Sequence, residues 1–99
     1  MGYYYNGNLE FEGKYLNGQR NGKGKEYNDK DKLIFEGEYL NGERIGKGKE
    51  FFFGKLKFEG EYLNGERNGK GKEYKDGKLI FDGEYLDDRK KWKRNGVLL

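Results

Sequence analysis

Apolar and polar residues alternate along this chain in short runs that recur at a nearly fixed interval. The motif Leu-x-Phe-x-Gly-x-Tyr begins at Leu9, Leu33, Leu56 and Leu79, so its copies lie 24, 23 and 23 residues apart. A period of two within each copy predicts a β-strand with one buried face, not a helix. The fixed spacing of the copies predicts a repeat architecture, in which each unit buries its apolar face against its neighbours.

The third copy, residues 58–80, predicts a β-hairpin with unlike faces. We expect Glu59 to pair with Lys72 and Gly60 with Gly71, because the second strand alternates glycine and lysine over 69–74. In the same register Glu61 would lie opposite Lys70 and Tyr62 opposite Gly69, across a four-residue loop at 64–67. One face would then carry Glu–Lys pairs. The other would carry rings beside bare glycine backbone, which indicates rings lying across glycine or strong curvature.

Connections between the hairpins follow from the same alternation. Lys75-Asp76-Gly77 predicts a three-residue loop, which places Glu73 opposite Leu79 and Gly71 opposite Phe81. A two-residue Asp-Gly loop would move Lys70 and Lys72 onto the aromatic face, so we favour the longer loop. The first connection, residues 28–31, is one residue longer and lacks glycine. A bulge or a wider turn should therefore restore its register.

These hairpins predict an all-β fold: a single-layer, elongated, twisted antiparallel β-meander of about seven to eight strands, built from about four 23-residue hairpin repeats. The repeat array would span 1–86, with units at about 11–34, 35–57 and 58–80 and partial units at both ends. Residues 87–99 would form a degenerate, basic C-terminal cap or tail. Because one layer cannot bury both faces, we expect the aromatic face to curl into a trough, pair with another copy or receive a partner.

The amino-acid composition excludes several kinds of catalytic and metal site. The 99 residues include no Cys and no His, and no Ser or Thr occurs. Zinc sites of the Cys/His kind and nucleophile–imidazole pairs cannot be built from them. We expect no enzyme, no metal and no cofactor. The net charge of +3 arises wholly from residues 87–99, so the repeat body should exert no bulk attraction on nucleic acid or on an anionic membrane. No apolar run approaches the roughly 20 residues that span a bilayer, and a cytoplasmic protein is expected.

The unit F/Y-x-G-x-Y-x-N-G-x-x-x-G-x-G, found at 11–24, 35–48 and 58–71, resembles the MORN (membrane occupation and recognition nexus) repeat. Tyrosine stands where that repeat has a consensus tryptophan. The resemblance implies a curved single-layer sheet whose aromatic trough binds helices or extended segments of other proteins. It also implies scaffolding, self-association in some members, and a proposed attachment to membranes through phospholipids.

Two groups of aromatic residues are candidates for a surface. The phenylalanines of the motif are expected to form an inter-repeat packing ladder, and the tyrosines are expected to line a surface for a partner. In the run at 51–53 at least one ring should be exposed. The Gly-Lys-Gly segments lack the context of a phosphate loop and are interpreted as structural. The expected protein-binding residues are Tyr15, Tyr39, Tyr62, Tyr85, Phe35, Phe58, Phe52 and Phe53.

The C-terminal segment carries a basic, aromatic cluster with several readings. It could cap the open end of the sheet, contact acidic phospholipid, contact a protein, or, least favoured, bind nucleic acid. Its residues are Arg89, Lys90, Lys91, Trp92, Lys93 and Arg94.

The function expected from these observations is non-catalytic. The chain would mediate protein–protein interaction or scaffolding through its aromatic-lined face. One alternative is a peripheral membrane module that binds acidic phospholipids through the basic segment. The other is a self-assembling structural element.

Overall fold

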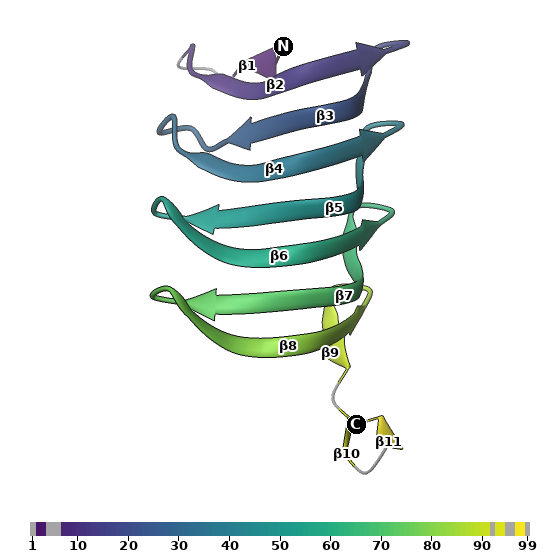
Figure 1. Cartoon of the computed structure of the whole chain (residues 1–99). Helices are drawn as coiled ribbons and strands as arrows, with labels where there is room; N and C mark the ends of the chain where they lie inside the picture. The colour runs from purple at the N-terminus through teal and green to yellow at the C-terminus, as the bar shows by residue number, and fades with distance from the viewer. Residues whose placement is uncertain (1, 4–6, 92, 95–96, 99) are drawn as a thin grey trace.

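The chain folds as one open, antiparallel β-sheet whose strands follow one another in sequence order (Figure 1). The computed structural model describes residues 2–3, 7–91, 93–94 and 97–98, the last two pairs by backbone alone. The predicted all-β meander is confirmed, with nine strands in the main sheet where about seven to eight were expected. Those strands are β1 (Gly2–Tyr3), β2 (Leu9–Leu16), β3 (Gln19–Tyr27), β4 (Leu33–Leu40), β5 (Glu43–Phe52), β6 (Lys55–Leu63), β7 (Glu66–Lys75), β8 (Lys78–Leu86) and β9 (Arg89–Lys91). A separate pair is formed by β10 (Lys93–Arg94) and β11 (Val97–Leu98).

Most hairpin turns are tighter than the sequence predicts. Leu63 pairs with Glu66, and Lys75 pairs with Lys78, so each turn has two residues. The expected four-residue loop at 64–67 and three-residue loop at 75–77 are therefore wrong. Both residues of each turn have positive φ, which is the geometry that matches the right-handed twist of paired strands.

Bulges restore the alternation that the short turns would otherwise invert. In the β7–β8 pair the register shifts between Glu73 and Tyr74, so that Glu73 lies opposite Phe81 and Gly71 opposite Gly83. The predicted pairing of Glu73 with Leu79 is wrong because a bulge absorbs the extra residue. The first connection, between β3 and β4, was expected to have either a bulge or a wider turn, and it has both.

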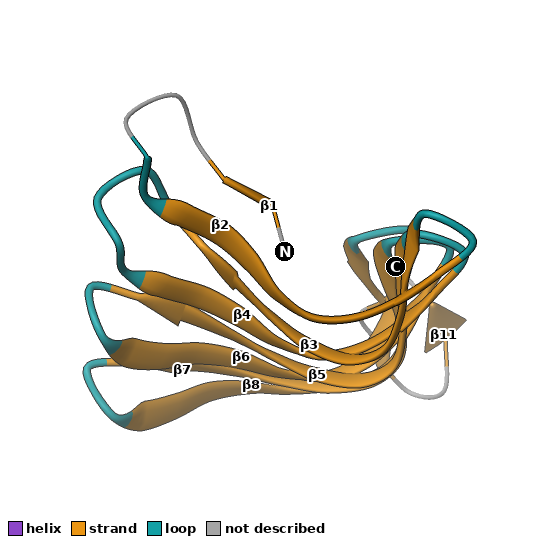
Figure 2. Ribbon diagram, turned by 90° about the horizontal axis from the view of Figure 1, so that it is seen from above, coloured by secondary structure: helices purple, strands orange, loops and turns teal. Residues whose placement is uncertain are grey.

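The predicted pairing of β6 with β7 is correct in the centre of the hairpin and wrong towards its turn. Glu59 pairs with Lys72 and Gly60 with Gly71, as predicted, but Tyr62 lies opposite Arg67. Gly69 has a φ of 95°, a conformation that glycine adopts without a Cβ penalty. The register passes from Gly60 directly to Tyr62 at this irregularity, so the predicted pairings of Glu61 with Lys70 and of Tyr62 with Gly69 are wrong. The Glu61 side chain instead accepts a hydrogen bond of 2.8 Å from the Lys70 amide. Figure 2 shows the resulting strong curvature of the strands.

Aromatic rings on one face form the core. Each buried tyrosine makes edge-on contacts with the phenylalanine of its own strand and with that of the preceding repeat. Tyr62, for example, has ring-centroid distances of 5.8 Å to Phe58 and 5.2 Å to Phe35. Such pairs each contribute about 0.5–1.5 kcal/mol beyond area burial. The expected packing ladder is confirmed, and its buried members are Phe11, Phe35, Tyr39, Phe58, Tyr62, Phe81 and Tyr85.

Glycine permits this packing because the rings lie directly over its backbone. A Cβ atom at Gly48 would lie 2.6 Å from Cζ of Phe35, and one at Gly71 would lie 2.6 Å from Cε1 of Phe58. The prediction of rings lying across glycine is confirmed. One sheet layer therefore buries an aromatic face with its own side chains.

Candidate functional site

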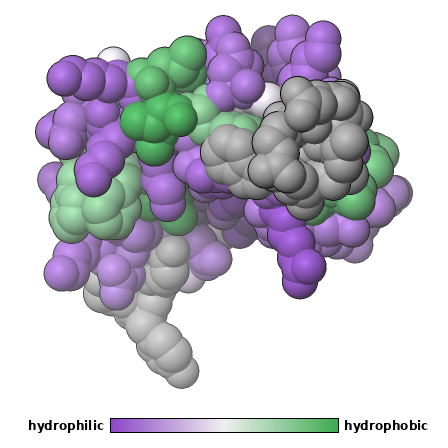
Figure 3. Space-filling view, turned by 90° about the horizontal axis from the view of Figure 1, so that it is seen from below, coloured by the Kyte–Doolittle hydropathy of each residue, from purple (hydrophilic) through white to green (hydrophobic). Residues whose placement is uncertain are grey.

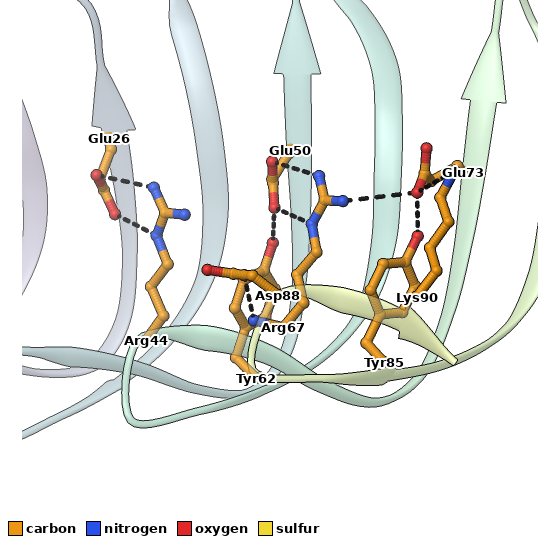
Figure 4. A network of polar contacts seen from close by, with 9 residues as sticks. All are labelled: Glu26, Arg44, Glu50, Tyr62, Arg67, Glu73, Tyr85, Asp88 and Lys90. Carbon is orange, nitrogen blue, oxygen red and sulfur yellow. Dashed lines mark hydrogen bonds and ion pairs between the residues drawn. The ribbon is translucent and has the colours of Figure 1, made fainter. Parts of the chain in front are cut away.

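Arginine and glutamate side chains cover the aromatic core. Arg44 lies 4.0 Å above the Phe35 ring and Arg67 lies 4.0 Å above the Phe58 ring, at distances typical of cation–π contact. Each guanidinium also binds a glutamate of the preceding repeat: Arg67 donates to Glu50 from Nε and Nη2, both at 2.9 Å. Figure 4 shows this network repeating from one hairpin to the next.

Tyrosine hydroxyls complete the network and explain why polar groups can be half-buried here. Tyr39 donates to Glu26, Tyr62 to Glu50 and Tyr85 to Glu73. None of the described side chains has a buried nitrogen or oxygen atom without a hydrogen-bond partner. A satisfied network of this kind fixes the spacing between repeats.

The network shifts the ionisation of its members. Burial opposes the charge of Glu26 and Glu50, but hydrogen bonds from Arg44 and Tyr39 to the first, and from Arg67 and Tyr62 to the second, outweigh it. Both glutamates therefore have a pKa below the ordinary value of 4.5. Burial, followed by the bond to glutamate, raises the pKa of the Tyr39 and Tyr62 hydroxyls well above 10. These shifts favour ionised glutamate and neutral tyrosine.

This packing corrects the expectation of an open aromatic trough. Tyr39, Tyr62 and Tyr85 are buried, as are Phe35 and Phe58, so these five rings offer almost no area to a partner. The reason is that arginine and glutamate cover a face that was expected to stay open. Sequence reasoning missed this cover, although the signal was present: Arg20, Arg44 and Arg67 recur at the repeat interval, as do Glu26, Glu50 and Glu73.

A groove lies instead on the opposite, charged face. It has a volume of about 1050 Å³ and crosses the strands from β2 to β8. Its floor is a ladder of glycines that pair with one another strand after strand. The glycines lining the groove are Gly24, Gly37, Gly48, Gly60 and Gly71.

Rows of alternating charge flank this floor. In one row each carboxylate lies in register with a lysine on the next strand, without interruption across seven strands. The second row is shorter, with in-register pairs such as Lys23 with Glu38 and Lys47 with Glu61. The continuous row, which we call the charge ladder, is Glu12, Lys25, Glu36, Lys49, Glu59, Lys72 and Asp82.

Most of the groove charges are not used in ion pairs within the chain. Among the described residues lining the groove, one lysine and one carboxylate approach within 4.0 Å, namely Lys25 and Glu36 at 3.9 Å. The predicted cross-strand Glu–Lys alternation is therefore present in register, but it forms few direct contacts. Three groove carboxylates accept hydrogen bonds of another kind: Glu12 from the Tyr27 hydroxyl, Glu59 from the Tyr74 hydroxyl and Glu61 from the Lys70 amide.

The remaining members of the predicted protein-binding set are exposed. Tyr15 is 41% exposed, Phe52 62% and Phe53 83%, which confirms that at least one ring of the run at 51–53 is exposed. A hollow of about 470 Å³ lies close by, lined by Lys55, Leu56, Tyr74, Asp76 and Gly77. Elsewhere the surface is mostly hydrophilic, with hydrophobic side chains in separate patches, as Figure 3 shows for one side of the molecule.

The basic C-terminal segment is only partly described. Lys90 lies opposite Tyr85, the position that arginine occupies in earlier repeats, and its Nζ is 5.2 Å from the Phe81 ring and 3.3 Å from Glu73. Lys90 therefore takes the place of arginine in the network of the last described repeat, while the role of residues 87–99 as a cap or tail stays a prediction. Arg89 is exposed and Lys91 is partly buried. Trp92 and the side chains of Lys93 and Arg94 lie outside the described residues, and a lipid role for this segment stays a prediction.

Among the described residues, no group of three or more carboxylates is placed to hold a metal ion. No helix that could span a bilayer is found in that part of the chain either.

Comparison with known proteins identifies the family of the repeat. The chain matches the MORN repeat at residues 11–32, 35–53 and 58–78. A search of the curated proteins found no match. MORN repeats are non-enzymatic and generally mediate interactions with proteins or membranes. Since the three matches cover more than half of its length, the chain belongs to the MORN repeat family.

Proposed function

We propose that this chain is a non-catalytic protein-interaction module that holds a segment of another protein in the groove of the charged face. The observation that carries the proposal is the set of groove charges that have few ion pairs of their own. Desolvating a charge is costly unless a partner compensates it. Alternating charges therefore select a partner that carries the complementary pattern.

Spacing favours a helix as the bound segment. Neighbouring strands lie about 4.8 Å apart, so opposite charges on the charge ladder recur at about that distance and like charges at about 9.6 Å. A helix rises about 5.4 Å per turn and presents one side chain per turn along a given line. A helix lying along the groove would therefore meet each strand with about one turn. An extended segment, whose residues on one face are about 6.6 Å apart, would fall out of register sooner.

Length follows from the same spacing. The charge ladder crosses seven strands, from β2 to β8, which corresponds to about 29 Å at the usual inter-strand distance. A helix of about 19 residues has that length. Its contact would combine charge pairing with the aliphatic parts of lysine and glutamate over the glycine floor.

A displayed library of random 20-residue peptides tests the proposal. Peptides enriched on the wild type would be measured by isothermal titration against the wild type and the groove variant K25Q/K49Q/K72Q. We expect the variant to bind about tenfold more weakly, since three charge pairs of roughly 0.2–1 kcal/mol each are lost. The matched control is Q19E/K30Q/K78Q. It changes the net charge by the same amount as the groove variant, at residues outside the groove. Enrichment of no peptide, or equal binding by the groove variant, would contradict the proposal.

A further inference from the structure

The first hairpin lacks contacts that the later hairpins share. Tyr39, Tyr62 and Tyr85 are 3%, 4% and 1% exposed, whereas Tyr15, at the same position of the first motif, is 41% exposed. Each of the three buried rings contacts a phenylalanine of the preceding repeat and donates its hydroxyl to a glutamate. Among the described residues, the ring that Tyr15 contacts is Phe11 of its own strand. The repeat interface at this end of the sheet is therefore unfilled.

Arg20 shows the same deficit. Its guanidinium lies 3.7 Å from Glu10 on its own hairpin and 3.9 Å from Glu26. The corresponding arginines of the next two hairpins each lie 2.9 Å from a glutamate of the preceding repeat. Arg20 therefore has no equally close carboxylate among the described residues.

Gly2 stands at the position that those glutamates occupy. It lies opposite Phe11 in the β1–β2 pair, as Glu26 lies opposite Phe35 in the β3–β4 pair. A Cβ atom at Gly2 would lie 3.6 Å from the Tyr15 hydroxyl oxygen. A glutamate side chain at this position would therefore have the room to complete the network.

The backbone at the outer edge of β2 is open over most of its length. In the part of the chain that the structure describes, β1 pairs with Leu9 and Phe11 of β2, and no strand pairs with residues 12–16 on that edge (Figure 1). Unpaired groups at a sheet edge accept an added strand from another chain. Because β1 has two residues, an added strand that displaced it would replace few contacts.

The later repeats show which residues an added strand needs. The strand before each motif places glycine opposite the tyrosine, lysine opposite each of the two acidic residues, glycine opposite glycine, and glutamate opposite the phenylalanine. The first motif differs at one of these positions, since Lys14 stands where the later repeats have Glu38, Glu61 and Glu84. Opposite charges in register stabilise paired strands and like charges destabilise them. An added strand therefore needs an acidic residue opposite Lys14.

We propose that β2 binds an extended segment of another protein by strand addition, and that this segment carries the pattern Gly-Glu-Gly-Lys-Glu antiparallel to β2. Its first glutamate pairs with Lys14 and its lysine pairs with Glu12. Its last glutamate takes the place of Gly2, beside Tyr15 and Arg20. Main-chain hydrogen bonds supply the affinity, and the charges supply the specificity. This edge is a second site, distinct from the groove that crosses the strands.

A second copy of the chain fits this edge less well. Its Gly-Lys-Gly strands carry lysine where an acidic residue is needed, and each is already paired on both sides. Two β2 strands could pair about Gly13, with Glu12 of each opposite Lys14 of the other. That register would place Tyr15 opposite Phe11, so it would bring no carboxylate to Arg20. A segment with the proposed pattern supplies both the charge for Lys14 and the carboxylate.

Fluorescence anisotropy with two labelled peptides tests the proposal. The unmatched peptide has the sequence of residues 68–75, and the matched peptide is the same sequence with the change K70E. We expect the wild type to bind the matched peptide about fivefold more tightly than the unmatched one. K14E, which copies the later repeats, should reverse this preference. Equal binding of the two peptides by the wild type, or an unchanged preference in K14E, would overturn the proposal.

Two variants at Gly2 test where the peptide binds. G2E supplies the carboxylate from β1 and should bind the matched peptide about tenfold more weakly than the wild type. G2A adds a methyl group alone and should bind it as tightly as the wild type does. Hydrogen exchange of the amides within 12–16 should slow in the complex, because the added strand covers this edge.

Four results would overturn strand addition by another protein. The first is a G2E variant that binds no more weakly than G2A, and the second is protection on β4 to β7 without protection at 12–16. The third is the absence of binding by either peptide. The fourth is a wild type that self-associates in sedimentation while K14E does not, because the occupant of the edge would then be a second copy.

Discussion

Replacing Gly48 by alanine tests the claim that rings packed on glycine hold the repeats together. The new Cβ would lie 2.6 Å and 2.7 Å from two Phe35 ring atoms and 3.0 Å from Cε1 of Tyr62. The Phe35 ring cannot move aside easily, because it is fully buried, contacts Tyr39 and Tyr62, and lies 4.0 Å below Arg44.

The expected change in the free energy of unfolding is the difference between two opposing effects. Overpacking a filled core costs about 1–3 kcal/mol. Alanine recovers about 0.5–1 kcal/mol relative to glycine, because the unfolded chain loses less freedom on folding. We therefore expect G48A to lower the free energy of unfolding by about 1–2 kcal/mol. Urea unfolding followed by circular dichroism measures this change.

A double-mutant cycle with F35L isolates the steric cause. Leucine lacks the ring atoms that the new methyl group would meet, so F35L should relieve the overpacking. We expect the double variant to be more stable than the sum of the two single changes predicts, by about 1 kcal/mol. Additive free energies, or a G48A variant as stable as the wild type, would refute the reasoning that the ring excludes a side chain at this position.

Three further outcomes follow from the contacts. R67M should lower the free energy of unfolding by about 1–3 kcal/mol, and R20M should lower it by less. Arg67 binds Glu50 at 2.9 Å, whereas Arg20 lies 3.7 Å and 3.9 Å from its two glutamates. Equal losses of stability in urea unfolding would contradict this reasoning. The urea midpoint should be highest between about pH 5 and pH 9. It should fall below pH 4.5 as the lowered-pKa glutamates Glu26 and Glu50 take up protons, and above pH 10 as the raised-pKa buried tyrosines ionise. E50Q should make the acid limb shallower, and an unchanged limb would argue against the network. F53N should raise the free energy of unfolding by about 0.5–1 kcal/mol, since asparagine accepts the left-handed turn; a loss of stability would show that the Phe53 ring packs within the fold.

The local sequence pattern predicted some contacts correctly and others incorrectly. The pairing of Gly60 with Gly71 follows from alternation near the middle of a hairpin, where nothing interrupts the strand. The pairing of Tyr62 does not, because Gly69 adopts positive φ and the register shifts there. Exposure of at least one ring in the run at 51–53 could be predicted, since three consecutive rings cannot all point to one face of a strand. The burial of Tyr62 could not, because Arg44 and Glu50, which come from other strands, lie over its ring and accept from its hydroxyl, respectively.

The sequence by itself determined the architecture. Alternation of apolar and polar residues requires strands, and a period of about 23 residues requires that each hairpin repeat the previous one. Tertiary structure alone decided which face is hollow and which surface is open. That choice depends on bulges, on glycine with positive φ, and on arginine reaching a glutamate one repeat away. Those features gain their stability from packing between repeats, so they cannot be inferred from any one unit.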